Sequence, residues 1–276
     1  MPLTPSNIGP SSGKIRAVIL DLDGTLIGPS EVITPVVKDA IGRLSRLLPV
    51  AIATGREASD VIRYAQELGL SSLQICDGGA TILNPVNGEH IWRSPLKPES
   101  ARKVMARLQE MGSAFIATHL TGSVRDYAQI PHWDLTRISA LDLQEETATK
   151  LAASFIGESG GGSDFEPGGG LGGENDIQTV KVFLPYNGLW AVDFTRHGVD
   201  KALAAKQLAR IWGVSTKEMA AAGDSYNDLP LLRTCGWRIA MGNAAEDVRA
   251  IAHYVAPPVD EDGLAEAIDR YVLPRV

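Results

Sequence analysis

The sequence has few cysteines, no excess of positive charge and no long apolar run, and each absence excludes a class of protein. Its two cysteines, Cys76 and Cys235, lie far apart, which excludes a disulfide framework or a cysteine zinc site and fits a reducing compartment. The net charge of −7 argues against bulk attraction to nucleic acid or anionic membrane. No apolar run approaches the roughly 20 residues of a membrane helix, and no signal peptide is recognisable. We therefore expect a soluble cytoplasmic protein, monomeric or a small homo-oligomer.

What is present is an alternation of strand and helix patterns in a chain of 276 residues. Residues 15–20, 49–53 and 73–76 are short apolar runs, too brief for core helices, and they predict buried strands. Apolar residues recur at helical spacing over 36–47 and 61–68. Strand–helix–strand–helix–strand predicts an α/β fold, in which parallel strands are joined by helical crossovers.

The middle of the chain departs from this pattern, because hairpins and helices are mixed over residues 83–196. The simplest explanation is an inserted smaller α+β domain, with a core built from residues 14–82 and 197–276 and a loose tail at 1–13. Residues 157–173 are dominated by Gly and Ser. This segment is read as a flexible surface insertion, because it does not open a helix carrying Lys-Ser/Thr as a phosphate-binding loop would.

Two carboxylates follow the first predicted strand. Asp21 and Asp23 are two residues apart, so in extended chain they project to the same side, and Gly24 permits a sharp turn. Close carboxylates repel unless a cation lies between them, and Mg²⁺ prefers such oxygen ligands. One Asp could then attack phosphorus while the other transfers a proton. The alternative is an ordinary acidic turn.

A basic residue also follows the second predicted strand. Arg56 could donate to a phosphate with its forked guanidinium, or it could be a surface residue paired with Glu57 or Asp60. Further along the chain, Lys201 lies near a predicted helix start, where the helix dipole disfavours a cation. A cation there suggests a nearby anion, although a solvated Lys is the alternative.

A second acidic pair follows a small-residue strand near residue 220. Asp224 and Asp228 are four residues apart, so both can reach one site if Asp228 lies in the first turn of a helix. Gly223 permits close approach, and Asn227 can hydrogen-bond a phosphate or ligand. The alternative is that these carboxylates only complement the helix dipole.

Together these stretches resemble the four motifs of the haloacid dehalogenase superfamily of phosphohydrolases. The stretches are Asp21-Leu22-Asp23-Gly24-Thr25, Ala53-Thr54-Gly55-Arg56, Lys201, and Gly223-Asp224-Ser225-Tyr226-Asn227-Asp228. The inserted block resembles the type IIB α/β cap of the Cof-like branch, which implies a Rossmann-like core with helices on both faces. Two positions depart from the branch: Ala202 stands where Gly is common, and Gly78 where Asn is common.

The resemblance also implies roles for residues of the first two motifs. Asp21 would be the nucleophile, and Asp23 the general acid and base, with its backbone carbonyl on Mg²⁺. Thr54 would donate a hydrogen bond to the phosphoryl group, while Gly55 leaves the backbone open beside it.

For the remaining motifs, the resemblance implies that Lys201 stabilises the nucleophile and the phosphoryl group. Asp224 would be a Mg²⁺ ligand, and Asp228 would lie in or behind the metal's ligand shell. Asn227 would contact phosphate.

These expectations point to a Mg²⁺-dependent phosphomonoester hydrolase acting through an aspartyl-phosphate on a small phosphorylated metabolite, a sugar phosphate or related phosphorylated acid. A phosphomutase of the same superfamily is an alternative, as is a non-enzymatic phospho-Asp/Mg²⁺ binding module. The inserted block also holds polar and aromatic side chains that could contact substrate, each more often a surface or core residue: His119, Arg125, His132, Trp133, Arg137 and Lys181.

Overall fold

The computed structural model describes residues 13–155, 176–184 and 187–276. The predicted N-terminal tail, except for Gly13, and the predicted Gly-rich surface insertion at 157–173 lie outside these ranges. None of the helices within them is long and apolar enough to cross a membrane. Cys76 and Cys235 are both buried and unpaired, in agreement with the predicted absence of a disulfide.

The larger sheet combines parallel strands with an antiparallel edge. Its order is β13 (Tyr254–Val255), β12 (Trp237–Ala240), β11 (Met219–Gly223), β1 (Ala17–Asp21), β2 (Val50–Ala53), β3 (Gln74–Cys76), β4 (Thr81–Leu83) and β5 (His90–Arg93). Neighbouring strands from β13 to β3 pair in parallel, whereas β4 and β5 add an antiparallel hairpin at one edge. β1 therefore lies between β2 and β11, which brings both predicted acidic stretches to the same edge of the sheet.

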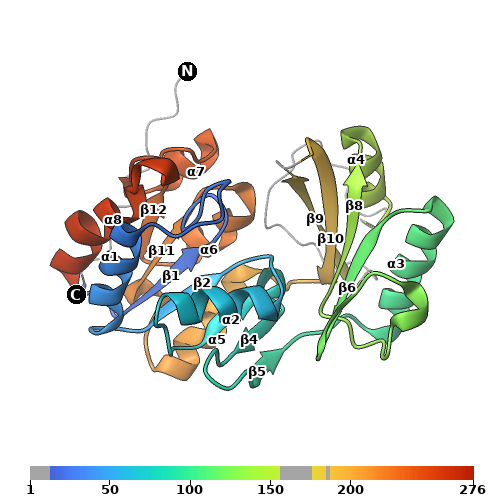
Figure 1. Ribbon diagram of the computed structural model, residues 1–276, viewed down its shortest axis with the longest axis horizontal. Coiled ribbons are helices and arrows are strands. Elements are labelled where there is room, and N and C mark those ends of the chain that lie inside the picture. The colour runs from blue at the N-terminus through green and yellow to red at the C-terminus, as the bar shows by residue number, and fades with distance from the viewer. Residues whose placement is uncertain (1–12, 156–175, 185–186) are drawn as a thin grey trace.

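Helices cover both faces of this sheet because its side chains alternate between them. Val18 and Leu20 belong to the apolar cluster under α1 (Pro35–Ser45) and α8 (Gly263–Ala267), which also includes residues of α2 (Ala58–Glu67). Ala17 and Ile19 face the other cluster, with α5 (Lys201–Trp212), α6 (Leu229–Thr234) and α7 (Glu246–Ile251). The predicted α/β fold is confirmed in this core (Figure 1).

Short helical turns lie between the longer elements of the chain. They are the 3₁₀ turns η1 (Asp77–Gly79), η2 (Tyr127–Gln129), η3 (Thr216–Glu218), η4 (Tyr226–Asp228), η5 (Val259–Glu261) and η7 (Leu273–Arg275), and the π-helical η6 (Ile268–Val272). η4 begins three residues after the end of β11 and leads into α6, so Asp224, between β11 and η4, and Asp228, the last residue of η4, both lie near the strand end.

A second, antiparallel sheet lies beside the first (Figure 1). Its order is β7 (Gly122–Val124), β6 (Phe115–His119), β8 (Arg137–Leu143), β10 (Leu189–Arg196) and β9 (Ile177–Leu184), and it packs with α3 (Pro98–Met111) and α4 (Glu145–Ala153) around its own apolar cluster. β4 and β5 belong to the first sheet, so the change from one sheet to the other comes after Arg93. The division into core and inserted domain at residues 83 and 196 stays a prediction.

The central strand β8 was not predicted. Its sequence begins with Arg137 and includes Ser139, and its alternation of polar and apolar residues changes phase between Ala140 and Leu141. Asp142 has a positive φ of 57°, and the pairing with β10 shifts register between Trp190 and Val192. An irregular strand that carries polar side chains inward gives a weak periodic signal.

Candidate active site

A buried lysine joins the first and last predicted motifs. Lys201 begins α5, and its Nζ donates to Asp21 Oδ1 at 2.5 Å and to Asp228 Oδ1 at 2.7 Å. All three side chains are buried. Burial alone would favour the neutral amine, but the charges of Asp21 and Asp228 outweigh it and raise the pKa of Lys201. The predicted anion near the helix start is therefore present, as a pair of carboxylates.

The loop after β11 is held by Asp228. Its Oδ2 accepts from the backbone N–H groups of Asp224 and Ser225, each at 3.1 Å. Gly223 leaves room for this, because a Cβ there would lie 2.6 Å from the Asp228 Cβ. Both oxygens of Asp228 thus accept hydrogen bonds within the protein, whereas Oδ1 of Asp224 is buried without a partner.

Three carboxylates meet at this point. One oxygen from each of Asp21, Asp224 and Asp228 lies within 4.8 Å of the others. Burial, and next the charge of Asp228, raise the pKa of Asp21 well above its usual value and that of Asp224 to about 7. Since crowded buried carboxylates with one unpartnered oxygen are suited to a hard cation, the cluster could hold a divalent metal ion.

The turn after β1 approaches this cluster closely. Gly24 has φ of 85°, and a Cβ there would lie 2.2 Å from Asp224 Oδ2. Asn243 was not predicted as a site residue, yet its Nδ2 donates to the Gly24 carbonyl at 2.8 Å and lies 3.4 Å from Asp224 Oδ2. Its Oδ1 accepts from the N–H of Val259 at 2.9 Å. Asn243 therefore fixes the turn against the acidic loop.

Asp23 is separate from the carboxylate cluster. Its side chain is 53% exposed. The Asp23 carboxylate accepts hydrogen bonds from Arg56 Nε at 3.1 Å and from Arg56 Nη2 at 2.6 Å. Arg56 Nη2 also donates to Glu31 Oε1 at 2.5 Å. Arg56 thus pairs with residues distant in sequence, and not with Glu57 or Asp60 as its surface interpretation supposed. These hydrogen bonds raise the pKa of the guanidinium against the opposing effect of burial.

The remaining motif residues surround the same strand ends. Thr54 is buried at the end of β2, where its Oγ1 accepts from the Arg56 N–H at 3.1 Å and keeps its own proton to donate. Asn227 accepts from Ser225 Oγ at 2.7 Å, which leaves its amide nitrogen as a donor. Gly55 lies opposite the second sheet, since a Cβ there would be 3.9 Å from Arg137 Nη1 and Asp193 Oδ2.

Of the six candidate substrate contacts in the second sheet and its helices, only Arg137 is brought to Gly55. Trp133 packs on Tyr127 and Arg102, while Lys181 lies over Trp190 and bonds to Thr149. His119 contacts Thr121, His132 is exposed, and Arg125 is exposed but acts electrostatically on Glu57.

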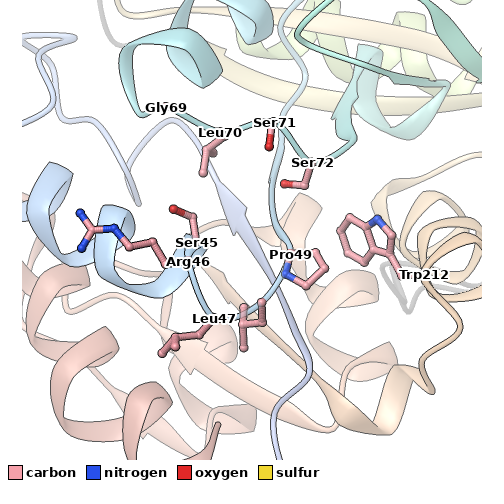
Figure 2. A pocket seen from close by; sticks show the side chains of 10 residues that line it. Ser45, Arg46, Leu47, Pro49, Gly69, Leu70, Ser71, Ser72 and Trp212 are labelled. Atoms are coloured by element: carbon pink, nitrogen blue, oxygen red, sulfur yellow. The ribbon is translucent and has the colours of Figure 1, made fainter.

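A cavity of about 350 Å³ lies at the other end of the core (Figure 2). It is lined by residues that precede β2 and β3, including Arg46 and Ser72, and by Trp212 at the end of α5. These are the amino ends of the strands, whereas the acidic residues follow the carboxyl ends. Ligands of open α/β sheets bind at the carboxyl ends, so the acidic cluster is the better candidate site.

Comparison with known proteins identifies the family of the chain. A sequence profile of the family described as haloacid dehalogenase-like hydrolase matches residues 18–150 and 177–268. A 5-amino-6-(5-phospho-D-ribitylamino)uracil phosphatase of Escherichia coli (strain K12) is 35% identical over 271 residues, covering 93% of this chain and 96% of the relative. A phosphoglycolate phosphatase of Archaeoglobus fulgidus is 24% identical over 262 residues, covering 92% and 96%. The solved structure of a HAD subclass IIB sugar phosphatase has a TM-score of 0.72 at 21% identity, covering 93% of this chain and 98% of that chain.

Proposed function

The chain belongs to the haloacid dehalogenase-like hydrolase family and is a phosphatase of that family, and we propose that it hydrolyses the phosphomonoester of a small metabolite through an aspartyl-phosphate. The family membership confirms the resemblance drawn from the four motifs. One observation carries the proposal: the buried Lys201 is bonded to Asp21 beside the unpartnered Asp224 oxygen.

Asp21 is the proposed nucleophile. Attack on phosphorus requires its ionised form, although burial and the charge of Asp228 favour the protonated one. The hydrogen bond from Lys201 opposes this preference and fixes Oδ1. The other oxygen, Oδ2, then forms the bond to phosphorus while the bond to the leaving alkoxide breaks.

Asp23 is the proposed proton donor to the leaving alkoxide and the base for the water that then cleaves the aspartyl-phosphate. Its carboxylate lies at the solvent-exposed side, where leaving group and water can both reach it. Arg56 holds it in place with two nitrogens.

Hydrogen-bond donors around the strand ends would hold the phosphoryl oxygens. Thr54 Oγ1, the Gly55 backbone, Arg56, the Asn227 amide and Lys201 are the candidates. Such fixed donors stabilise charge that spreads over the phosphoryl oxygens in the transition state.

The proposed metal is Mg²⁺, whose ligands would be Asp21, Asp224 and the Asp23 carbonyl. Asp228, with both oxygens already engaged, would act behind these ligands by orienting Lys201 and the Asp224 loop. Bound Mg²⁺ would supply positive charge that offsets the crowded carboxylates and the phosphoryl oxygens.

The test is release of inorganic phosphate from p-nitrophenyl phosphate with Mg²⁺ and with EDTA, together with intact-mass analysis after rapid acid quench. Wild type should release phosphate only with Mg²⁺ and should gain the mass of one phosphoryl group, whereas Asp21→Asn should do neither. With a hexose 6-phosphate in place of p-nitrophenyl phosphate, isomerised sugar phosphate without free phosphate would point to a mutase. Phosphorylation without turnover would point to a binding module.

A further inference from the structure

Two charged side chains of the second sheet lie over Gly55. Arg137 is on β8 and Asp193 on the neighbouring strand β10, and their side chains are only 12% and 16% exposed. A Cβ on Gly55 would lie 3.9 Å from both Arg137 Nη1 and Asp193 Oδ2. The pair therefore stands next to Gly55, the residue that follows the predicted phosphate contact Thr54.

The pair is poorly satisfied within the protein. Arg137 Nη1 lies 3.6 Å from Asp193 Oδ2, which is beyond hydrogen-bond distance, and the buried Nε has no partner. In the part of the chain that the structure describes, the Arg137 side chain makes no hydrogen bond. Asp193 is fixed, since its Oδ1 accepts from Ser139 Oγ at 2.5 Å. Burying a guanidinium in this way is costly unless a ligand completes its hydrogen bonds.

The surrounding charge is predominantly negative. Burial alone would raise the pKa of Glu57. Hydrogen bonds and the positive charges of Arg137 and Arg125 outweigh burial and lower that pKa. Arg137 also acts on the buried Asp77, whose pKa is raised by burial against the effect of Arg137. Arg137 thus acts on three acidic residues, Asp193, Glu57 and Asp77, and Arg125 acts on Glu57. A leaving group that carries its own carboxylate would meet repulsion here.

We propose that Arg137 and Asp193 recognise hydroxyl groups on an uncharged polyol leaving group, so that the substrate is a polyol or sugar phosphate and not a phosphorylated acid. A hydroxyl can donate to Asp193 Oδ2 and accept from Arg137, which fits the open donors and acceptor together. An anion satisfies only Arg137 and is repelled by the carboxylates. This inference rests on the proposed phosphatase function.

The experiment compares two substrates that differ at one end: sorbitol 6-phosphate, with a hydroxymethyl group, and 6-phosphogluconate, with a carboxylate. p-Nitrophenyl phosphate, which lacks hydroxyl groups, reports the chemistry alone. We expect wild-type kcat/KM to favour sorbitol 6-phosphate at least about tenfold, since buried polar groups left unpaired penalise the wrong ligand. Asp193→Asn should shift that ratio about tenfold toward 6-phosphogluconate.

Arg137→Gln should lower kcat/KM for sorbitol 6-phosphate about tenfold or more and leave p-nitrophenyl phosphate within about threefold. The matched control is Asp134→Asn, which removes a carboxylate that pairs with Arg93 away from Gly55. It should leave the substrate ratio unchanged. If either test variant melts far below wild type, Ser139→Ala gives a milder change, because it frees Asp193 and should lower only the sorbitol 6-phosphate rate.

The outcomes distinguish a failure of the proposed phosphatase function from a failure of the proposed hydroxyl recognition. If wild type releases phosphate from none of the three compounds, the proposed function fails and the inference with it. If wild type hydrolyses p-nitrophenyl phosphate but acts on sorbitol 6-phosphate and 6-phosphogluconate at equal rates, or hydrolyses neither of them, the inference alone is overturned. A substrate ratio that Asp193→Asn, Arg137→Gln and Ser139→Ala all leave unchanged also overturns it.

Discussion

Replacing Asp224 by asparagine should make the metal-free protein more stable at neutral pH. The side chain keeps its shape but loses a charge that the folded state disfavours, because burial and Asp228 raise its pKa to about 7. In the unfolded chain the Asp224 carboxyl has its ordinary pKa of 3.8. Above pH 7 the carboxyl is ionised in both states, and its negative charge is less favourable in the folded protein than in the unfolded chain.

The magnitude follows from the difference between the two pKa values. A shift of about 3 units corresponds to roughly 4 kcal/mol of lost stability at pH 8, about 2 kcal/mol near pH 5.5 and none below pH 4. For a chain of this size, 4 kcal/mol corresponds to a melting-temperature difference of roughly 10 °C. Asp224→Asn should therefore match wild type at pH 4 and exceed it increasingly up to pH 7.

The assay is thermal unfolding in EDTA from pH 4 to 8, with the exposed Asp260→Asn as control. The control should follow wild type throughout. Mg²⁺ should then narrow the difference near neutral pH without abolishing it, because wild type gains about 2.7 kcal/mol at 100 times the dissociation constant, which is less than the variant's lead, and the variant has lost a ligand. Wild-type and Asp224→Asn curves that coincide over the whole pH range in EDTA would refute the electrostatic reasoning.

Other variants test neighbouring parts of the site. Asp21→Asn should abolish phosphate release while stability holds or rises, since it removes both the nucleophile and a crowded charge; retained turnover on a verified substrate would exclude Asp21 as nucleophile. Lys201→Met should lower the free energy of unfolding by about 3–5 kcal/mol, because Asp21 and Asp228 lose their buried cation, and urea denaturation with no loss would contradict this. Asn243→Ala should cost about 0.5–1.5 kcal/mol, because it removes exposed hydrogen bonds to Gly24 and Val259, and it should weaken the Mg²⁺-dependent rise in melting temperature, with an unchanged rise counting against its role.

The strand-end residues could be predicted because their signals are local. Asp21 and Thr54 each follow a short apolar run. Lys201 lies at the start of a helix that the sequence predicts. Strand order then brings these ends together, and a parallel sheet with crossovers was predictable from the alternation of elements.

Contacts that join distant turns could not be read from local pattern. Glu57 and Asp60 are the acidic residues close to Arg56 in sequence, and local pattern therefore predicts them as its partners. The partner in the structure, Asp23, lies 33 residues away. Asn243 bonds to the carbonyl of Gly24 across 219 residues. Such pairs depend on which loops become neighbours at the sheet edge, and the periodicity of apolar residues along the sequence does not contain this information.

The position of β1 between β2 and β11 also has a consequence for synthesis of the chain. Ala17 pairs with Met219, so the second neighbour of β1 leaves the ribosome about 200 residues later, which at 5–20 residues per second is roughly 10–40 s. During that interval β1 is an apolar strand with one open edge, which can pair with other chains. Nascent chains halted before β11 should therefore depend on chaperones, while the second sheet, whose strands are all complete by residue 196, can fold earlier.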